Sequence, residues 1–344
     1  AWDGFLQKAA YPELLFPFGY GDGGGGPTDE MLEYAARLEQ FPGLPACRQG
    51  VEESYFDDVR VAGPDLPVWV GELYLETHLG TYTTQSATKK ANRKNELLLR
   101  EAEVWGSLAN AYGAAIDVEE ALRPAWRNLL LLQFHDILPG SSIGEVYREA
   151  KEDHAQIESI GRSVRDAGLR ALADGVGAQG DVVAFNSLSW SRSDLVTATI
   201  PDLNAKVGDV LELLQPDGLA FPAQVIGQSE KGAEIAFVPE SVPPLGYVAL
   251  AVRRPAAAPE HALRAESNCI ENRYFYLELD EEGGIRRLLD KRTAREVLPA
   301  GRTGNHLQLF QDGPEREAAW NVHATFEKRE YAWDPGTTFE VLEQ

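Results

Sequence analysis

Apolar side chains recur with the period of an α-helix in the middle of the chain. The first stripe comprises Leu98, Ala102, Trp105, Ala109 and Tyr112. These residues follow one another at intervals of three or four positions, which places them on one side of a helix. The stripe therefore predicts a helix with one buried face.

A second helix is predicted from Val118 to about His135, before Pro139 and Gly140 break the pattern. Its buried face is expected to comprise Ala125, Leu129 and Leu132. The run from Leu129 to Leu132 is apolar on every side of the helix. That run predicts that this helix is the most buried of the group.

A third helix is predicted from Ser142 to about Asp174. Ser142 and Glu145 have the spacing of a capping box, in which each side chain bonds to the main-chain N–H group of the other residue. Helices with short connections pack as a bundle. Residues 85–176 are therefore predicted to form a three-helix bundle.

The segments on either side of this bundle differ from it. Residues 1–84 are rich in loops, with a helix predicted over Asp29–Gln40 and a strand predicted over Val68–Glu76. Residues 177–344 contain predicted short strands at 182–185, 194–200, 233–238 and 274–279. Pro, Gly, Asn and Asp separate these strands, which predicts an antiparallel β-sandwich. The chain is therefore predicted to be a multidomain α+β protein.

The charge and composition of the chain exclude some classes of partner and favour one cellular compartment. Lys and Arg total 32 and Asp and Glu total 54, which gives a net charge of −22. A surface this acidic repels phosphate backbones and anionic lipids, so nucleic acid and membranes are poor candidates as partners. The only cysteines are Cys47 and Cys269. They exclude a disulfide scaffold and favour a reducing compartment, so we predict a cytoplasmic protein.

Candidate chemistry begins at His135 and Asp136, at the expected end of the second helix. A histidine there can point an imidazole nitrogen away from the bundle, and neutral imidazole is the commonest metal ligand in proteins. The carboxylate beside it could orient a ligand or bind sugar hydroxyls. Alternatively, His135 only stabilises the C-terminal dipole of the helix and Asp136 belongs to the turn.

Further acidic candidates lie nearer the start of the chain. Glu72 and Glu76 are four residues apart, so a strand would place both on one face. A carboxyl enclosed by apolar walls gains the raised pKa that a general acid needs. Asp22 lies in a glycine-rich segment that could approach a neutral ligand such as a sugar. The alternatives are a solvated strand face for the glutamates and a flexible tight turn for Asp22. The basic cluster Lys89–Lys94 is predicted to form a solvated helix face.

Several motifs together resemble the middle of a glycoside hydrolase family 38 α-mannosidase of the bacterial and cytosolic branch. They are Phe18–Thr28, Gly71–Arg93 and Leu130–Ile143. The segments Val183–Trp190 and Glu271–Tyr274 resemble the start of the β-rich C-terminal region of that family. The motifs occur in the order and at the spacing of the family, along nearly the whole chain.

The resemblance implies a division of the chain. Residues 1–84 would be the tail of an α/β barrel-like catalytic domain, 85–176 the three-helix bundle, and 177–344 the start of the β region. It also implies a retaining glycosidase that cleaves terminal α-mannosides of oligosaccharides with two carboxylates about 5 Å apart. A divalent metal, usually zinc, would be held by two His and two Asp and would bind the mannose hydroxyls.

The resemblance also implies roles for single residues. His135 matches a metal ligand and Asp136 a substrate contact, with Asp22 as a further candidate contact. Glu72 is the best match for the general acid/base, and Glu76 is the alternative.

One departure from the family affects the expected activity. The chain contains no His-x-Asp, which supplies a ligand pair in the family, and the nucleophilic Asp of the family has no match here. Because the chain also opens with Ala1 in what resembles the interior of a domain, we expect an internal fragment. Catalytic zinc sites keep at least three protein ligands, so we expect this fragment to be inactive alone and to bind zinc weakly.

The alternative function is a non-catalytic carbohydrate-binding or scaffolding module. Such a module would bind sugars on exposed aromatic platforms, for which Trp320, Tyr331 and Trp333 are candidates. The sequence leaves open whether the protein forms a homo-oligomer.

Overall fold

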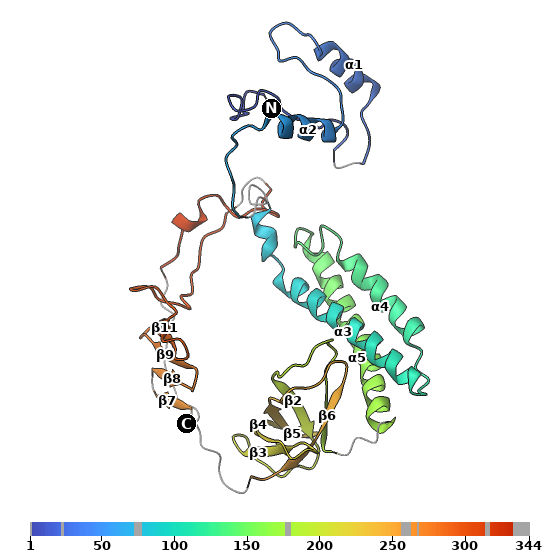
Figure 1. The fold of residues 1–344 in the computed structure, drawn as a ribbon, viewed down its shortest axis with the longest axis vertical. Coiled ribbons are helices and arrows are strands. Elements are labelled where there is room, and N and C mark those ends of the chain that lie inside the picture. The colour runs from blue at the N-terminus through green and yellow to red at the C-terminus, as the bar shows by residue number, and fades with distance from the viewer. Residues whose placement is uncertain are drawn as a thin grey trace. The chain divides into compact units, whose positions relative to one another are not determined.

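The structure is a computed structural model in which the chain divides into two compact units, Ala1–Leu73 and Tyr74–Gln344 (Figure 1). The structure describes residues 2–21, 24–71, 78–175, 180–255, 263–266, 268–313 and 317–332. Helices occur in both units, and the antiparallel sheets lie in the second. The prediction of a chain that combines helices with antiparallel sheet is confirmed.

The first unit carries two short helices, α1 (Asp29–Leu38) and α2 (Glu52–Ala62). The Thr28 side chain accepts a hydrogen bond from the Met31 N–H group at 3.3 Å, as an N-cap residue does. Neither helix buries a residue in the described part of this unit. These helices therefore gain little stability from packing within the unit.

The strand predicted over Val68–Glu76 is wrong for its described part, residues 68–71, which have no strand structure. Val68 and Val70 are 88% and 91% exposed. Among the described residues no neighbouring strand pairs with this segment, and an extended segment without such a neighbour is not stable. Residues 72–76 lie outside the described residues.

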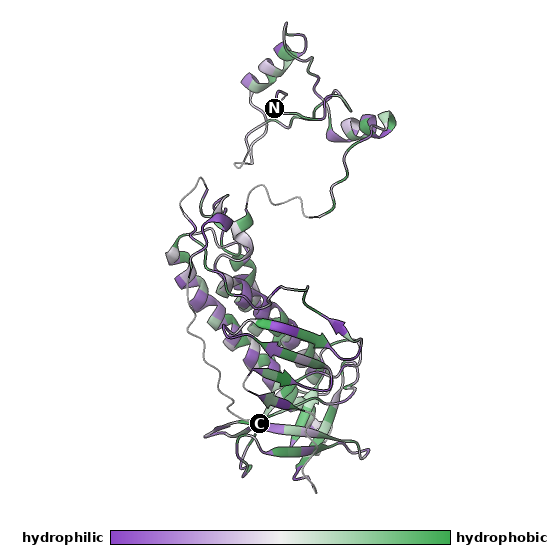
Figure 2. Ribbon diagram, turned by 90° about the vertical axis from the view of Figure 1, so that its left-hand side faces the viewer, coloured by the Kyte–Doolittle hydropathy of each residue, from purple (hydrophilic) through white to green (hydrophobic). Residues whose placement is uncertain are grey.

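The second unit opens with the 3₁₀ turn η2 (Leu79–Tyr82) and continues into the helices α3 (Ser86–Ala111), α4 (Val118–Leu132) and α5 (Gly144–Gly175). The helices pack against one another around one apolar core. This core comprises Leu99, Ala102, Leu122, Ala125, Leu129, Leu132, Ala150, Ile157 and Val164. Hydrophilic and hydrophobic residues alternate along the helical ribbons (Figure 2), as is expected of helices that bury one face.

The prediction that α4 is the most buried of the three helices is wrong, since 4 of its 15 residues are buried against 9 of 26 in α3. Leu130 and Leu131 are 61% and 63% exposed, whereas Leu129 and Leu132 are buried. The helical period, and not the unbroken apolar run, therefore decides which of these leucines reaches the core. Within the described residues, no helix combines the length and apolar character needed to cross a membrane.

The boundaries of the helices also differ from the prediction. Helix α4 ends at Leu132 and not at His135. Helix α5 begins at Gly144, and Ser142 forms no capping box with Glu145. The Ser142 hydroxyl donates instead to the main-chain oxygen of Asp136 at 2.7 Å, so Ser142 stabilises the preceding turn.

Glycines allow α3 and α5 to approach closely. A Cβ atom at Gly168 of α5 would lie 2.7 Å from the main-chain carbon of Trp105 and 2.8 Å from the nitrogen of Gly106, both in α3. A Cβ at Gly161 would lie 2.9 Å from Cγ of Leu98. Real Cβ contacts are not this short, so the two helices can pack this way only where glycine removes the side chain.

A polar pair lies inside this helix contact. The side-chain nitrogen of Asn95 in α3 lies 3.2 Å from Nδ1 of His154 in α5 and donates to the His154 main-chain oxygen at 3.0 Å. His154 is only 5% exposed, and within the described residues its Nε2 has no hydrogen-bond partner. Burial lowers the pKa of His154, partly offset by the charge of Asp153, so the folded protein holds a neutral imidazole.

The first sheet has the strand order β1-β6-β3-β4-β5-β2 with antiparallel pairing throughout. Its strands are β1 (Val182–Phe185), β2 (Val196–Ile200), β3 (Val210–Leu214), β4 (Ala220–Ser229), β5 (Gly232–Phe237) and β6 (Tyr247–Arg253). The predicted strands at 182–185, 194–200 and 233–238 correspond to β1, β2 and β5. Alternate residues of β3 and β5, such as Leu211, Leu213 and Ile235, point into one core.

The second sheet has the order β11-β10-β9-β8-β7, also antiparallel. Its strands are β7 (Arg264–Glu266), β8 (Cys269–Glu271), β9 (Phe275–Leu279), β10 (Ile285–Asp290) and β11 (Arg295–Glu296). A hairpin turn at 280–284 joins β9 to β10, where the Asp280 carboxylate accepts from the N–H groups of Glu282 and Gly284. A β-sandwich over residues 177–344 stays a prediction.

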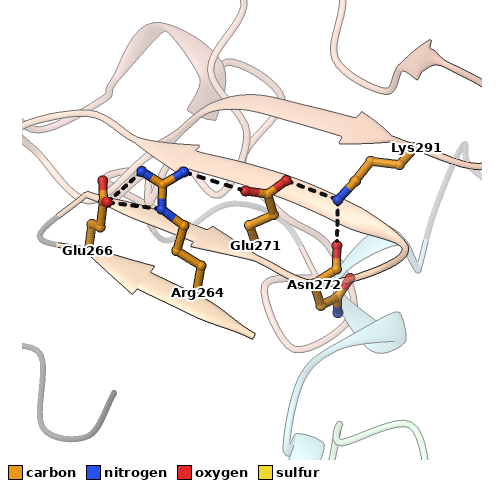
Figure 3. A network of polar contacts seen from close by, with 5 residues as sticks. All are labelled: Arg264, Glu266, Glu271, Asn272 and Lys291. Atoms are coloured by element: carbon orange, nitrogen blue, oxygen red, sulfur yellow. Dashed lines mark hydrogen bonds and ion pairs between the residues drawn. The ribbon is translucent and has the colours of Figure 1, made fainter. Parts of the chain in front are cut away.

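A polar network crosses this second sheet (Figure 3). Glu271 accepts a hydrogen bond from Lys291 Nζ at 2.9 Å and lies 3.8 Å from Arg264, which also bonds to Glu266. Lys291 also donates to the main-chain oxygen of Asn272 at 3.0 Å. The hydrogen bond from Lys291 is the main cause that lowers the pKa of Glu271. The motif Glu271–Tyr274 thus links strands of the sheet.

Helix α3 is bonded to the loop that follows β1. Arg100 donates to the main-chain oxygen of Ser187 at 3.1 Å, and the Ser187 hydroxyl donates to Glu101 at 3.3 Å. The neighbouring Asn186 is 1% exposed and its side-chain nitrogen donates to the main-chain oxygens of Trp190, Val242 and Pro243. These bonds fix the first sheet to α3.

Replacement of Gly168 by Ala should lower the free energy of unfolding by about 1–3 kcal/mol, because the new Cβ overlaps the main chain of α3. Gly144→Ala in the same helix is the matched control, since a Cβ there has no atom within 4 Å, and should change it by less than about 0.5 kcal/mol. Urea unfolding of both variants measures the difference. Equal effects would contradict the close packing of α3 and α5.

His154 should make the protein less stable in acid. The unfolded chain protonates this imidazole below about pH 6.5, whereas the folded state keeps it neutral, so the free energy of unfolding should fall as the pH drops through that range. His154→Leu should flatten this part of the pH profile of urea unfolding. An unaltered profile for His154→Leu would refute this assignment.

Candidate active site

The chain turns back on itself between Leu132, the last residue of α4, and Gly140. The N–H group of Ile137 donates to the main-chain oxygen of Phe134 at 2.9 Å and closes the turn. The side chain of His135 is 78% exposed, and its ring centroid lies 4.2 Å from that of Phe134. The imidazole therefore points away from the helix core.

The Asp136 carboxylate is held by its neighbours. Its Oδ1 accepts a hydrogen bond from the Ser141 hydroxyl at 3.0 Å, and its Oδ2 lies 3.3 Å from Nε2 of His135. Its main-chain oxygen accepts from the hydroxyls of Ser142 at 2.7 Å and Tyr147 at 3.2 Å. The side chain remains 38% exposed, so the carboxylate has a fixed direction and stays accessible to a polar ligand.

The turn packs tightly against the segment that precedes α3. Gly140 has a φ of +97°, and a Cβ atom there would lie 2.6 Å from the main-chain oxygen of Thr84. A side chain would be strained by this backbone conformation and would also collide with Thr84. Glycine at position 140 is therefore required for the contact between the two segments.

Lys89 bonds to both of these segments. Its ammonium donates to the main-chain oxygens of Thr84 at 2.6 Å, Leu138 at 2.9 Å and Pro139 at 2.9 Å. The prediction of a solvated helix face is wrong for Lys89, although the neighbouring Lys90 is exposed. Partial burial lowers the pKa of the Lys89 ammonium.

A third segment meets the same region from the C-terminal part of the chain. The N–H group of Gly80 donates to the main-chain oxygen of Trp320 at 2.8 Å, and that of His78 donates to the side-chain oxygen of Asn321 at 2.6 Å. The ring of Trp320 stands edge-on to that of His78, with centroids 6.5 Å apart. Segment 78–84 thus contacts both Trp320 and the turn that carries His135.

The structure describes only some of the other predicted site residues. Glu72, Glu76 and Asp22 lie outside the described residues, and so does the proposed platform residue Trp333. Trp320 is half-buried and Tyr331 is 50% exposed. Among the predicted catalytic, substrate-binding and metal-binding residues, the structure therefore describes His135 and Asp136, which lie side by side.

The contributions of Lys89, Gly140 and Asn321 to this region are not predicted from the sequence. Lys89 and Leu138 are 49 positions apart, and His78 and Asn321 are 243 positions apart. Periodicity and local motifs report contacts between near neighbours. A single chain carries no signal for hydrogen bonds of such long range.

The described residues do not make a complete metal site on their own. Among them, no three or more His, Cys, Asp or Glu side chains come together in a way that could hold an ion. His135 and Asp136 supply one imidazole and one carboxylate, which is fewer donors than a catalytic zinc site uses.

Three family models match separate segments of the chain, and residues 173–269 lie between two of them. Residues 1–72 match the glycosyl hydrolases family 38 N-terminal domain, residues 76–172 the alpha mannosidase middle domain, and residues 270–344 the family 38 C-terminal domain. The chain belongs to glycosyl hydrolase family 38. The His135–Asp136 turn lies within the middle-domain match of this family 38 chain.

Relatives of this family 38 chain carry α-mannosidase names. The human alpha-mannosidase 2C1 is 33% identical over 317 residues, which are 92% of this chain and 28% of the relative. Alpha-mannosidase G of Dictyostelium discoideum is 29% identical over 332 residues, which are 87% of this chain and 30% of the relative. The chain thus spans less than a third of the length of these proteins.

A solved structure shows the same fold. A family 38 protein from Enterococcus faecalis superimposes with a TM-score of 0.51 and 18% identity, over 79% of this chain and 36% of that protein. This likeness supports the arrangement of helices and antiparallel sheet.

Replacement of Gly140 by Ala should separate the turn from Thr84. Gly113→Ala is a matched control, because Gly113 has a φ of +96° but no atom within 4 Å of a Cβ. Both variants should lose about 1–2 kcal/mol of unfolding free energy to backbone strain. Gly140→Ala should lose about 1–3 kcal/mol more, because of the collision.

Urea unfolding of the two variants measures this difference. An equal loss of stability in both would show that the contact between Gly140 and Thr84 does not constrain the turn.

Proposed function

We propose that this chain is part of a retaining glycoside hydrolase that cleaves terminal α-mannosides of oligosaccharides. The observation that carries the proposal is the exposed His135–Asp136 pair, held in a turn within the segment that matches the α-mannosidase middle domain. The names of the relatives support the same substrate class. A cytoplasmic location is part of the proposal and is in line with the free Cys47 and Cys269.

The proposal divides the chain into three domains. Residues 1–84 belong to the α/β catalytic domain, residues 85–176 form a three-helix bundle, and residues 177–344 form the β-sandwich region. The family matches support this division, because one ends at residue 72 and the next covers residues 76–172. The shared core of α3, α4 and α5 supports the bundle.

Carboxylates perform the chemistry in this proposal. Asp136 accepts hydrogen bonds from mannose hydroxyls, which its fixed orientation favours, and Asp22 is a further candidate contact. Glu72, with Glu76 as the alternative, is the general acid/base. It donates a proton to the leaving oxygen and then removes one from the attacking water, as the partner of a carboxylate nucleophile about 5 Å away.

His135 is proposed as one ligand of a divalent metal, with zinc the first candidate. Its ring is exposed and beside a carboxylate, an arrangement that orients metal-binding histidines in other proteins. Because the described residues do not complete such a site, we expect the 344-residue chain by itself to bind zinc weakly and to be inactive.

Replacement of His135 by Ala tests the proposal in the protein that carries this chain. The variant should lose bound metal and should hydrolyse an aryl α-mannoside at least about 100-fold more slowly, because a ligand is removed. His306→Ala, at an exposed position outside the turn, is the control and should keep both properties. Metal analysis and the release of the aryl group measure the two effects.

Several outcomes would contradict these assignments. Unchanged metal stoichiometry in His135→Ala would remove His135 from the site. Robust turnover by the 344-residue chain alone would overturn the expectation that it is inactive. Glycan binding that is lost in Trp320→Ala but survives Asp136→Ala would support the carbohydrate-binding module instead.

A further inference from the structure

The hydrogen bonds of the Lys89 ammonium differ from those of an ordinary surface lysine. Its Nζ lies within 2.9 Å of the main-chain oxygens of Thr84, Leu138 and Pro139. An ammonium group has three N–H donors, so these bonds use its whole capacity. Lys89 forms no ion pair with the described carboxylates, although the protein is strongly acidic.

The position of Lys89 in its helix makes this arrangement informative. Lys89 is the fourth residue of α3, which begins at Ser86. The N-terminal end of a helix carries partial positive charge, so a lysine there is disfavoured by the helix dipole. The bonds to main-chain oxygens offset this, which indicates that contact with the turn, and not support of the helix, explains the lysine.

The oxygens that Lys89 binds come from both sides of one junction. Leu138 and Pro139 end the turn that carries His135 and Asp136, whereas Thr84 follows η2. The Thr84 hydroxyl in turn donates to the main-chain oxygen of Gly80 at 2.6 Å. The ammonium therefore joins the turn to segment 79–84.

We propose that Lys89 is a positioning residue, whose ammonium holds the His135–Asp136 turn against segment 79–84 and so fixes the direction of both side chains. The contribution to sugar cleavage rests on the function proposed above. The attachment of the turn does not rest on it, because that attachment follows from the hydrogen bonds alone. The two parts can therefore be tested separately.

Amide hydrogen exchange tests the attachment. Lys89→Met keeps the length of the side chain and removes its donors, and Lys90→Met is the matched control at the exposed neighbouring position. In Lys89→Met the amides of Ile137, Leu138 and Gly140, which are bonded within the turn, should exchange at least about tenfold faster. Amides of the α3 and α5 core should exchange as in the wild type, and Lys90→Met should match the wild type throughout.

A conservative variant separates positioning from general stability. Lys89→Arg keeps the charge, but its planar guanidinium cannot direct donors to three converging oxygens as an ammonium does. It should therefore restore protection of the turn in part. Unchanged exchange in the turn of Lys89→Met, or a uniform rise over all helices, would overturn the proposal. If Lys89→Met does not fold, Lys89→Gln is measured by the same criteria.

The mannosidase assay gives the second readout, in the protein that carries this chain. Lys89→Met should lower kcat for an aryl α-mannoside at least about tenfold, with a smaller change in KM, and Lys90→Met should change neither. If the wild type hydrolyses no α-mannoside, the proposed function fails while the exchange experiment still decides the role of Lys89. Normal kcat in Lys89→Met with a loosened turn would refute its part in cleavage.

Discussion

The close contact between α3 and α5 is the constraint on which the second unit depends. Gly168 lets α5 approach the main chain of α3, and Gly161 makes room for the side chains of Leu98 and Leu99. Helix α3 contacts both the candidate site and the first sheet. Lys89 near its start bonds to the turn that carries His135, and Arg100 in its middle donates to the main-chain oxygen of Ser187, which follows β1. A shift of α3 against α5 would therefore displace the candidate site and the first sheet together.

Hydrogen bonds from side chains to main-chain oxygens determine the conformation of the turn in the candidate site. The oxygen of Asp136 is bonded by the hydroxyls of Ser142 and Tyr147, and the oxygens of Leu138 and Pro139 by an ammonium. Buried main-chain groups without partners are costly, so these side chains fix a turn that has no regular secondary structure. The ring of His135 is not needed for this bonding, which leaves it exposed.

Elements with a repeating pattern could be predicted from the sequence. Leu129 and Leu132 mark the buried face of α4 correctly, and the strand at 182–185 was placed to the residue. Both follow from local periodicity. The ends of the helices are harder to predict. The Ser142 hydroxyl, for example, bonds to the main-chain oxygen of Asp136 and not to the first turn of α5. The bonds of Lys89 to the turn could not be predicted, since Leu138 and Pro139 lie about 50 positions further along the chain.

Exposed leucines on α4 have a consequence for the behaviour of concentrated solutions. Leu130 and Leu131 are more than half exposed on a molecule with a net charge of −22 at pH 7. Electrostatic repulsion keeps such molecules apart, but the net charge vanishes near the isoelectric point of about 4.7. Colloidal stability should therefore decline as the pH falls towards this value, and buffers well above the isoelectric point suit purification and storage.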